Sequence, residues 1–286
     1  MDRQLQPKEL PPPQLRRLAR AAGHLGSAAC AATGAAAGDA EAPRLVVGYW
    51  SIRGLGAPLR MMCEYAGVPY EAKLFDDDQP EAEQWPAYKA ELSKKNPLAN
   101  LPFVIDGDVV VTQSNACLTY LAGKLGLMGA VGGARGGPLA ERALVEQCLC
   151  QVMDLRNDAV ALFYGNQIPF TDPPVNNPDE NAAVYLSDTV SVHYGKLEAW
   201  LELHGTTFLA GATPTAADFH LFEMLDQHSA FAVDFGLADP IDTCPRLDAL
   251  ASAFRALPQL AGYFAGPLHA LPMNHAPAAL WGGEAR

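Results

Sequence analysis

The chain has 286 residues, of which 49% are hydrophobic, and it carries a formal net charge of −12. This size and apolar content exclude a wholly disordered chain and fit one large domain or two ordinary ones. The acidic balance counts against a partner nucleic acid, whose phosphates require a positive surface, and no apolar stretch approaches the ~20 residues of a membrane span.

Residues 1–43 are rich in alanine, glycine and proline and offer little large apolar surface. Such a composition does not offset the entropy lost on ordering, so we expect a mostly disordered N-terminal extension. The stretch QLRRLARAA has the pattern of a short basic amphipathic helix, as in organelle targeting segments. Asp2, Glu9 and the scarcity of serines count against that alternative.

Residues 44–127 alternate strand and helix signals in the order β-α-β-α-β-β-α. Two apolar runs joined by Asp-Gly predict a hairpin, and Ser114 is expected to be the N-cap of the last helix. The expected elements are strands in RLVVGYW and YEAKLF, helices in APLRMMCEYAG and WPAYKAELSKK, the hairpin in LPFVIDGDVVVTQ, and a helix in SNACLTYLAGKLG.

A glycine-rich linker at residues 128–138 is expected to separate this unit from an all-helical domain at residues 139–286. Helical spacing of apolar residues predicts four long helices there. They lie in LAERALVEQCLCQVMDLRNDAVALFYG, AAVYLSDTVSVHYGKLEAWLEL, TAADFHLFEMLDQHSAF and CPRLDALASAFRALPQL.

Six cysteines are scattered along the chain without a C-x-x-C pair. We therefore expect neither a disulfide framework nor a zinc site, and a reducing compartment fits best. Cys148 and Cys150 are interpreted as packing thiols of an apolar helix, with metal binding as the alternative.

Four motifs in series, GYWSIRGL, NLPFVIDG, TQSNACLTYLA and QVMD, resemble the cytosolic glutathione transferases, and the mu class in particular. The resemblance covers residues 45–281. It implies a thioredoxin-like glutathione-binding domain followed by an all-helical domain with a hydrophobic-substrate site. It also implies glutathione as a co-substrate, with no other cofactor and no metal.

Tyr49 stands at the end of the first expected strand, where α/β sheets place their ligands. A free thiol has a pKa near 8.5, and a hydrogen bond to the thiolate lowers that value. The resemblance makes Tyr49 the hydroxyl that donates to the glutathione sulfur, whereas periodicity alone favours a packing aromatic.

Further glutathione contacts follow from the resemblance. Leu101 would pair its backbone with the cysteinyl unit before a cis Pro102, and Gln113 and Ser114 would hold the γ-glutamyl carboxylate. Asp154, on the next helix, would act across the interface of a homodimer. The remaining predicted contacts are Trp50, Leu55, Trp85, Lys89 and Asn100.

The hydrophobic electrophile is expected beside Tyr164 and Arg156, with the first-strand loop and the C-terminal tail setting selectivity. Arg156 could equally be a salt-bridging helix residue. Thr215 and Asp218 match a capping box of the family's helical core and are interpreted as stability residues.

Three positions depart from the mu pattern. Ala82 replaces an arginine directed at the glycyl carboxylate, in an acidic loop at residues 76–84 that is shorter than usual. Leu98 replaces an aromatic residue of the dimer interface, and Thr119 replaces an interfacial arginine. The homodimer is still expected, with altered contacts.

The sequence thus predicts a cytoplasmic detoxification enzyme, a glutathione transferase whose thiolate attacks hydrophobic electrophiles. The first alternative is a non-catalytic protein that binds glutathione or hydrophobic ligands on the same scaffold. A glutaredoxin-like thiol exchanger would need a cysteine where Tyr49 stands.

Overall fold

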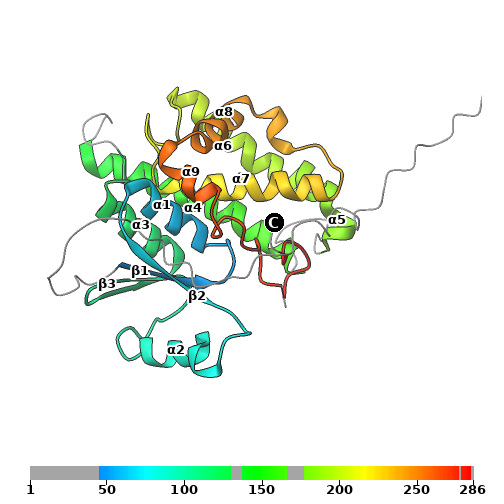
Figure 1. The fold of residues 1–286 in the computed structure, drawn as a ribbon. Coiled ribbons are helices and arrows are strands. Elements are labelled where there is room, and N and C mark those ends of the chain that lie inside the picture. The colour runs from blue at the N-terminus through cyan, green and yellow to red at the C-terminus, as the bar shows by residue number, and fades with distance from the viewer. Residues whose placement is uncertain (1–44, 130–136, 166–176, 277, 285–286) are drawn as a thin grey trace, which may run out of the picture. The chain divides into compact units, whose positions relative to one another are not determined.

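A computed structural model of the chain describes residues 45–129, 137–165, 177–276 and 278–284. The expected N-terminal extension lies outside these residues, as does most of the expected linker. The described part begins with the predicted order of elements (Figure 1). They are β1 (Leu45–Trp50), α1 (Gly56–Ala66), β2 (Tyr70–Phe75), α2 (Trp85–Leu92), β3 (Phe103–Asp106), β4 (Val109–Thr112) and α3 (Ser114–Leu125).

The four strands form one mixed sheet in the order β2-β1-β3-β4. β1 pairs parallel with β2 from Leu45 opposite Tyr70 to Trp50 opposite Phe75, and antiparallel with β3. β3 and β4 form the predicted hairpin, in which Gly107 takes the positive φ of 60° that a tight turn requires. This topology brings the end of β1 beside the start of β3.

Helices cover both faces of the sheet. α1 and α3 lie on one face, where buried residues such as Leu59 and Leu121 join the large core shared with the helical half. α2 lies on the other face, where Trp85 and Leu92 pack on Phe75 and Phe103 in a separate cluster (Figure 1). The face that carries α1 is therefore the one that meets the helical half.

The second half of the described chain is helical. The apolar periodicity that predicts a single helix at residues 182–203 corresponds to α5, a π-helical turn and α6 in succession. The turn η3 (Tyr185–Val190) inserts wider i→i+5 spacing into an otherwise continuous helix. The elements are α4 (Gly137–Phe163), α5 (Pro178–Val184), α6 (Ser191–His204), α7 (Ala216–Asp234), α8 (Pro245–Arg255) and α9 (Ala261–Phe264).

Helix α7 is the central element of the helical half and packs against α1, α3 and α4. Its start is held by the predicted capping box: an Asp218 carboxylate oxygen accepts from the Thr215 amide and hydroxyl, each at 2.8 Å. The other Asp218 oxygen accepts from the Leu209 amide at 2.8 Å. Burial raises the pKa of Asp218 to about 6, although these hydrogen bonds favour the carboxylate.

Two sequence-based expectations are wrong in detail. Ser114 is the first residue of α3, and Gln113, with a φ of 73°, is the N-cap residue, without a side-chain cap. Cys150 is exposed, whereas Cys148 is buried, because residues two apart point to opposite sides of a helix. Of this pair, Cys148 alone is therefore a packing thiol. Among the described residues, no helix is long and apolar enough to cross a membrane.

Candidate active site

Tyr49 is the penultimate residue of β1, and its side chain is only 6% exposed. The ring packs in a small cluster with Ile52 and Leu55, to which Leu101 and Met153 contribute. Within the described part of the chain, the Tyr49 hydroxyl has no hydrogen-bond partner. The apolar cluster thus holds the ring while its hydroxyl remains available to a ligand.

Two glycines make room for the Tyr49 ring. Gly54 has a φ of +36°, and a Cβ there would lie 2.9 Å from Cε1 of Tyr49. A Cβ at Gly56 would lie 2.8 Å from Cδ1 of Tyr49 and 2.2 Å from an Arg60 guanidinium nitrogen. Gly54 is therefore required by close packing and by backbone conformation, and Gly56 by close packing.

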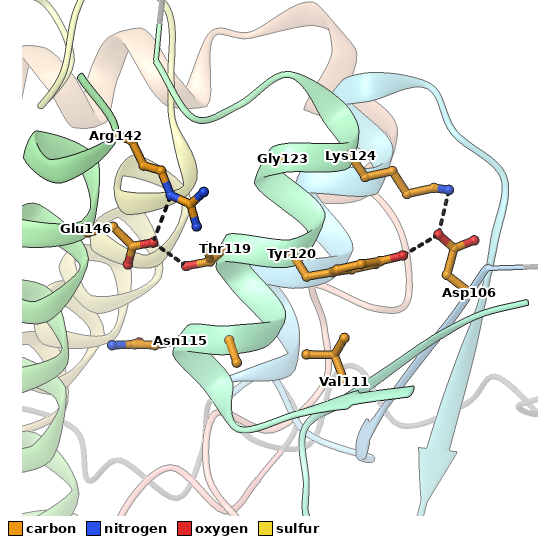
Figure 2. A pocket seen from close by; sticks show the side chains of 10 residues that line it. Asp106, Val111, Asn115, Thr119, Tyr120, Gly123, Lys124, Arg142 and Glu146 are labelled. Atoms are coloured by element: carbon orange, nitrogen blue, oxygen red, sulfur yellow. Dashed lines mark hydrogen bonds and ion pairs between the residues drawn. The ribbon is translucent and has the colours of Figure 1, made fainter. Parts of the chain in front are cut away.

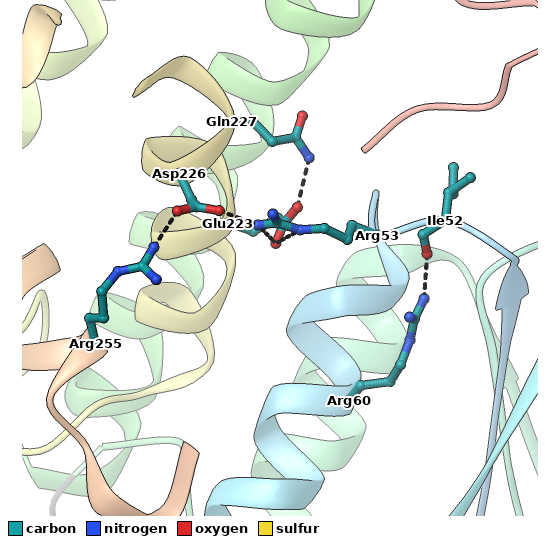
Figure 3. A network of polar contacts seen from close by, with 7 residues as sticks. All are labelled: Ile52, Arg53, Arg60, Glu223, Asp226, Gln227 and Arg255. Atoms are coloured by element: carbon teal, nitrogen blue, oxygen red, sulfur yellow. Dashed lines mark hydrogen bonds and ion pairs between the residues drawn. The ribbon is translucent and has the colours of Figure 1, made fainter. Parts of the chain in front are cut away.

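The loop between β1 and α1 is anchored to α7 by a buried ion-pair network (Figure 3). Arg53, 3% exposed, donates to Glu223 at 2.8 Å and to Asp226 at 2.6 Å. Burial alone would lower the pKa of Arg53, but the two carboxylates raise it instead, so the guanidinium stays charged. Asp226 also accepts from Arg255, and Gln227 donates to Glu223 at 2.8 Å.

On the sheet side, the structure brings several predicted glutathione contacts together. The Leu101–Pro102 peptide bond is cis, as the resemblance implies, and directly precedes β3. Leu101 and Trp50 each pack against both the Tyr49 cluster and the cluster under α2. Leu55, 8% exposed, is a member of the Tyr49 cluster.

The other predicted contacts on the sheet side lie farther along this edge. Trp85 begins α2 and is stacked on Phe103 with ring centroids 6.0 Å apart, and the Lys89 ammonium lies over the Trp85 ring. Asn100 is exposed directly before Leu101. Gln113 and Ser114 lie where β4 enters α3, and the Ser114 amide is at the positive end of that helix.

On the helical side, a cavity of about 20 Å³ adjoins Tyr49. Its lining combines the first-strand loop with α4 and α7, and the two residues predicted to contact the electrophile, Arg156 and Tyr164, belong to it. The polar remainder of the lining is His220, Gln227 and Asn274. In this conformation the cavity has room for about one water molecule.

The C-terminal segment covers this cavity. Pro272 and Met273 accept hydrogen bonds from the Arg53 and Gly54 amides at 2.7 and 3.2 Å. The His275 amide donates to the Tyr164 hydroxyl at 2.9 Å, and the His275 ring lies 4.9 Å from the Trp50 ring. Burial raises the pKa of Tyr164, so its hydroxyl keeps a proton that it can donate.

Asp154, in contrast, does not line the Tyr49 cavity, although the preceding residue, Met153, packs against the Tyr49 cluster. Asp154 is exposed on α4 and lines a different pocket, of about 280 Å³, together with Gln151, Cys150 and Lys196.

The chain is similar to known proteins along most of its length. Residues 45–123 match the glutathione S-transferase N-terminal domain, and residues 154–267 match the C-terminal domain. Glutathione S-transferase Mu 1 of Oryctolagus cuniculus is 32% identical over 77% of this chain and 89% of its own length. The class-mu 26 kDa isozyme 1 of Fasciola hepatica is 31% identical over 84% of this chain and 95% of its own.

The chain belongs to the glutathione S-transferase family.

A solved structure supports the fold of this glutathione S-transferase. The pi-class enzyme of Onchocerca volvulus superposes with a TM-score of 0.62 over 80% of this chain and 97% of its own, at 22% identity. The predicted fold class, a thioredoxin-like domain followed by a helical domain, is confirmed.

A hollow of about 750 Å³ in this glutathione S-transferase lies away from Tyr49, between α3 and α4 (Figure 2). Thr119 donates to Glu146 across it at 3.0 Å, and Arg142 extends from α4 toward the same carboxylate. At its other end, Asp106 accepts from Tyr120 at 2.8 Å and pairs with Lys124 at 2.6 Å. These four polar contacts are internal to the hollow, whereas the buried Asn115 Oδ1 atom has no hydrogen-bond partner among the described residues. The hollow shares no lining residue with the Tyr49 cavity.

Sequence reasoning missed the polar residues of the Tyr49 cavity, namely His220, Gln227 and Asn274. One signal was present: His220, Glu223 and Gln227 follow i, i+3, i+7 spacing in an otherwise apolar helix, so they share one face. Among the described residues, no group of three or more His, Cys, Asp or Glu side chains could hold a metal ion.

Proposed function

We propose that this protein transfers glutathione to electrophiles by using the Tyr49 hydroxyl to stabilise the glutathione thiolate. The observation that supports this role is the position of the Tyr49 hydroxyl at the end of β1, beside Leu101 and the cis proline, without a hydrogen-bond partner among the described residues. A hydroxyl that donates to the sulfur favours the thiolate over the thiol. The thiolate is the nucleophile, so a lower thiol pKa gives more reactive glutathione at neutral pH.

Glutathione would lie along the edge formed by the ends of β1, the loop before β3 and the start of α3. The Leu101 backbone would pair with the cysteinyl unit, in the manner of an added strand. The Ser114 amide at the start of α3 would bind the γ-glutamyl carboxylate, with Gln113 beside it. Trp50, Leu55, Trp85, Lys89 and Asn100 would contact the remaining parts of the tripeptide.

The electrophile would enter between Tyr49 and Tyr164, with Arg156 on the same wall. Catalysis then consists of thiolate stabilisation and of positioning the two reactants together. The sulfur forms its bond to the electrophilic carbon, and the bonding pair leaves with the displaced group or moves onto the electrophile. We assign the physiological role to detoxification of hydrophobic electrophiles in the cytoplasm.

The test is conjugation of glutathione to 1-chloro-2,4-dinitrobenzene by the parent protein and by Tyr49→Phe. We expect the substitution to lower kcat by roughly 100-fold and to raise the apparent pKa of the bound thiol, while glutathione affinity is retained. Tyr70→Phe is the matched control, because its hydroxyl bonds Glu64 at the opposite end of the sheet. An unchanged rate and pH profile for Tyr49→Phe would refute the assigned role. Binding of glutathione without any conjugation by the parent would favour a binding protein.

We further propose a homodimer in which Asp154 of each chain reaches the partner's glutathione. The exposure of Asp154 and its absence from the lining of the Tyr49 cavity support this arrangement, and the hollow between α3 and α4 offers a surface for the partner. Light scattering should give twice the chain mass, and Asp154→Ala should raise the KM for glutathione more than it lowers kcat. A monomer with full activity would overturn the proposal.

A further inference from the structure

His220 is a buried residue of the Tyr49 cavity with no partner for its polar atoms. It lies in the second turn of α7 and is 1% exposed. Neither ring nitrogen has a hydrogen-bond partner among the described residues. Buried polar groups in folded proteins are nearly always paired, and leaving one unpaired is costly. An unpaired imidazole at this place therefore needs an explanation.

The surroundings of His220 keep its ring neutral. Burial lowers the pKa of His220 to about 3, and the positive charge of Arg156 on α4 contributes to that shift. The titratable and charged groups that line the cavity from the other elements are Tyr49, Arg156 and Tyr164. A neutral imidazole offers one N–H donor and one acceptor nitrogen, so it suits an uncharged polar ligand group.

The polar lining is also unusual for a site that receives hydrophobic compounds. Arg156, Gln227 and Asn274 line the same small cavity as His220. Ligand sites are mostly apolar, with a few polar groups that fix the orientation of the ligand. Tyr164 and Gln227 have partners in this conformation, in His275 and Glu223, whereas His220 has none.

We propose that His220 is a specificity-determining residue of the electrophile site, which hydrogen-bonds an oxygen conjugated to the carbon that the thiolate attacks. The inference rests on the proposed function. It adds the residue that selects among electrophiles and the oxygen that this residue recognises. An α,β-unsaturated ketone carries such an oxygen and serves as the probe of this contact. Its carbonyl oxygen would occupy the space of about one water molecule that the cavity offers.

The chemistry balances without another reactant. The sulfur forms a bond to the β-carbon, and the π pair of the C=C bond moves to give an enolate whose negative charge lies on oxygen. The His220 N–H and the Arg156 guanidinium stabilise that oxygen, because charge develops there in the transition state. A proton then adds to the α-carbon and matches the proton that glutathione lost when its thiolate formed.

Access for such a compound requires displacement of the segment around residues 272–276. Asn274 lines the cavity, and Pro272 and Met273 accept hydrogen bonds from the Arg53 and Gly54 amides of the β1–α1 loop.

The experiment compares two electrophiles of similar size. Benzylideneacetone carries a ketone conjugated to its reactive carbon, whereas benzyl chloride carries no oxygen or nitrogen. The ratio of their kcat/KM values is measured for the parent, His220→Leu, His220→Gln and Met224→Leu. Met224 lines the same cavity from the same helix without a hydrogen-bonding group and is the matched control.

We expect the ratio for His220→Leu to fall about tenfold, mainly through kcat, as loss of one hydrogen bond to the developing charge predicts. His220→Gln, which keeps a donor and an acceptor, should restore most of it, and Met224→Leu should stay within about threefold of the parent. Equal loss in Met224→Leu, or an unchanged ratio in His220→Leu, would overturn the inference. A parent that conjugates benzyl chloride but not the ketone would also overturn it, whereas a parent that conjugates neither refutes the proposed function itself.

Discussion

Two buried histidines lie about two turns apart on α7 and have opposite surroundings. His228 accepts or donates at both ring nitrogens, to the hydroxyl groups of Tyr185 at 2.8 Å and Tyr194 at 3.1 Å. His220 has no partner at either nitrogen within the described chain. Burial lowers the pKa of both rings to about 3. The same residue type thus completes a structural core at one place and is left unsatisfied beside the cavity at the other.

The contrast between the two histidines identifies a position, His220, at which the folded protein is less stable than it could be. Satisfied polar groups on α7, including Glu223 and Asp226 with Arg53, fix one arrangement of the core. The unsatisfied imidazole lowers stability and leaves a hydrogen-bonding group ready for a ligand. Removing a paired polar group of α7 should therefore lower the unfolding free energy, whereas removing the unpaired imidazole should raise it.

The largest loss of unfolding free energy is expected when one charge of the buried ion pair between Arg53 and Glu223 is removed. Arg53→Met would leave the Glu223 carboxylate buried without its cation, which costs about 3–5 kcal/mol of unfolding free energy. Urea unfolding measures the loss. The double variant Arg53→Met/Glu223→Leu should recover most of it, because no unpaired charge remains. A single variant within about 1 kcal/mol of the parent would contradict the buried geometry.

Next in size is the loss of His228. His228→Leu leaves the hydroxyl groups of Tyr185 and Tyr194 buried without a partner, at a cost of about 3 kcal/mol. The triple variant that also carries Tyr185→Phe and Tyr194→Phe should be more stable than His228→Leu alone. Thermal or urea unfolding checks both, and a neutral His228→Leu would show that the hydroxyl groups have other partners.

The smallest effect is expected for His220→Leu. This substitution should raise the unfolding free energy, and the gain should increase as the pH falls. His220→Leu should stabilise the fold by about 1 kcal/mol at pH 7.5, because it removes an unpaired buried polar group. Below pH 6.5 the unfolded parent gains a proton at His220 that the folded parent does not bind above pH 3, so the parent loses stability as the pH falls. At about 1.4 kcal/mol per pH unit, the advantage of the variant should reach about 3 kcal/mol at pH 5.

Unfolding midpoints of the parent and His220→Leu at a series of pH values check this prediction. A constant difference between them from pH 7.5 to pH 5 would mean that His220 titrates normally in the folded state.

The fold was largely predictable because its signals are local. The alternation in YEAKLF, the Asp-Gly turn before β4 and the Thr215–Asp218 capping box each depend on a few neighbouring residues. The resemblance to a known family supplied the cis proline and the choice of Tyr49. The residues assigned to contact glutathione remain predictions that experiments must test.

The cavity was not predictable in the same way, because it joins residues far apart in the chain. Tyr49, Arg156 and Asn274 line it from three distant parts of the chain, and no local pattern encodes their proximity. The polar stripe of α7 indicated a special face, but not that the face opens toward Tyr49 rather than solvent. The π-helical turn at Tyr185–Val190 was not predicted for another reason. One turn of wider spacing hardly alters the periodicity of apolar residues in the sequence.

The network around Arg53 also constrains how the enzyme can be altered. Arg53 follows Tyr49 closely on the first-strand loop, and its partner Glu223 holds Gln227 on the cavity wall. A substitution that enlarges the electrophile site at Gln227 therefore disturbs the support of the residue that acts on the thiol. Directed evolution toward bulkier substrates should find paired changes at these positions more readily than single ones, because neighbours in one network are not additive.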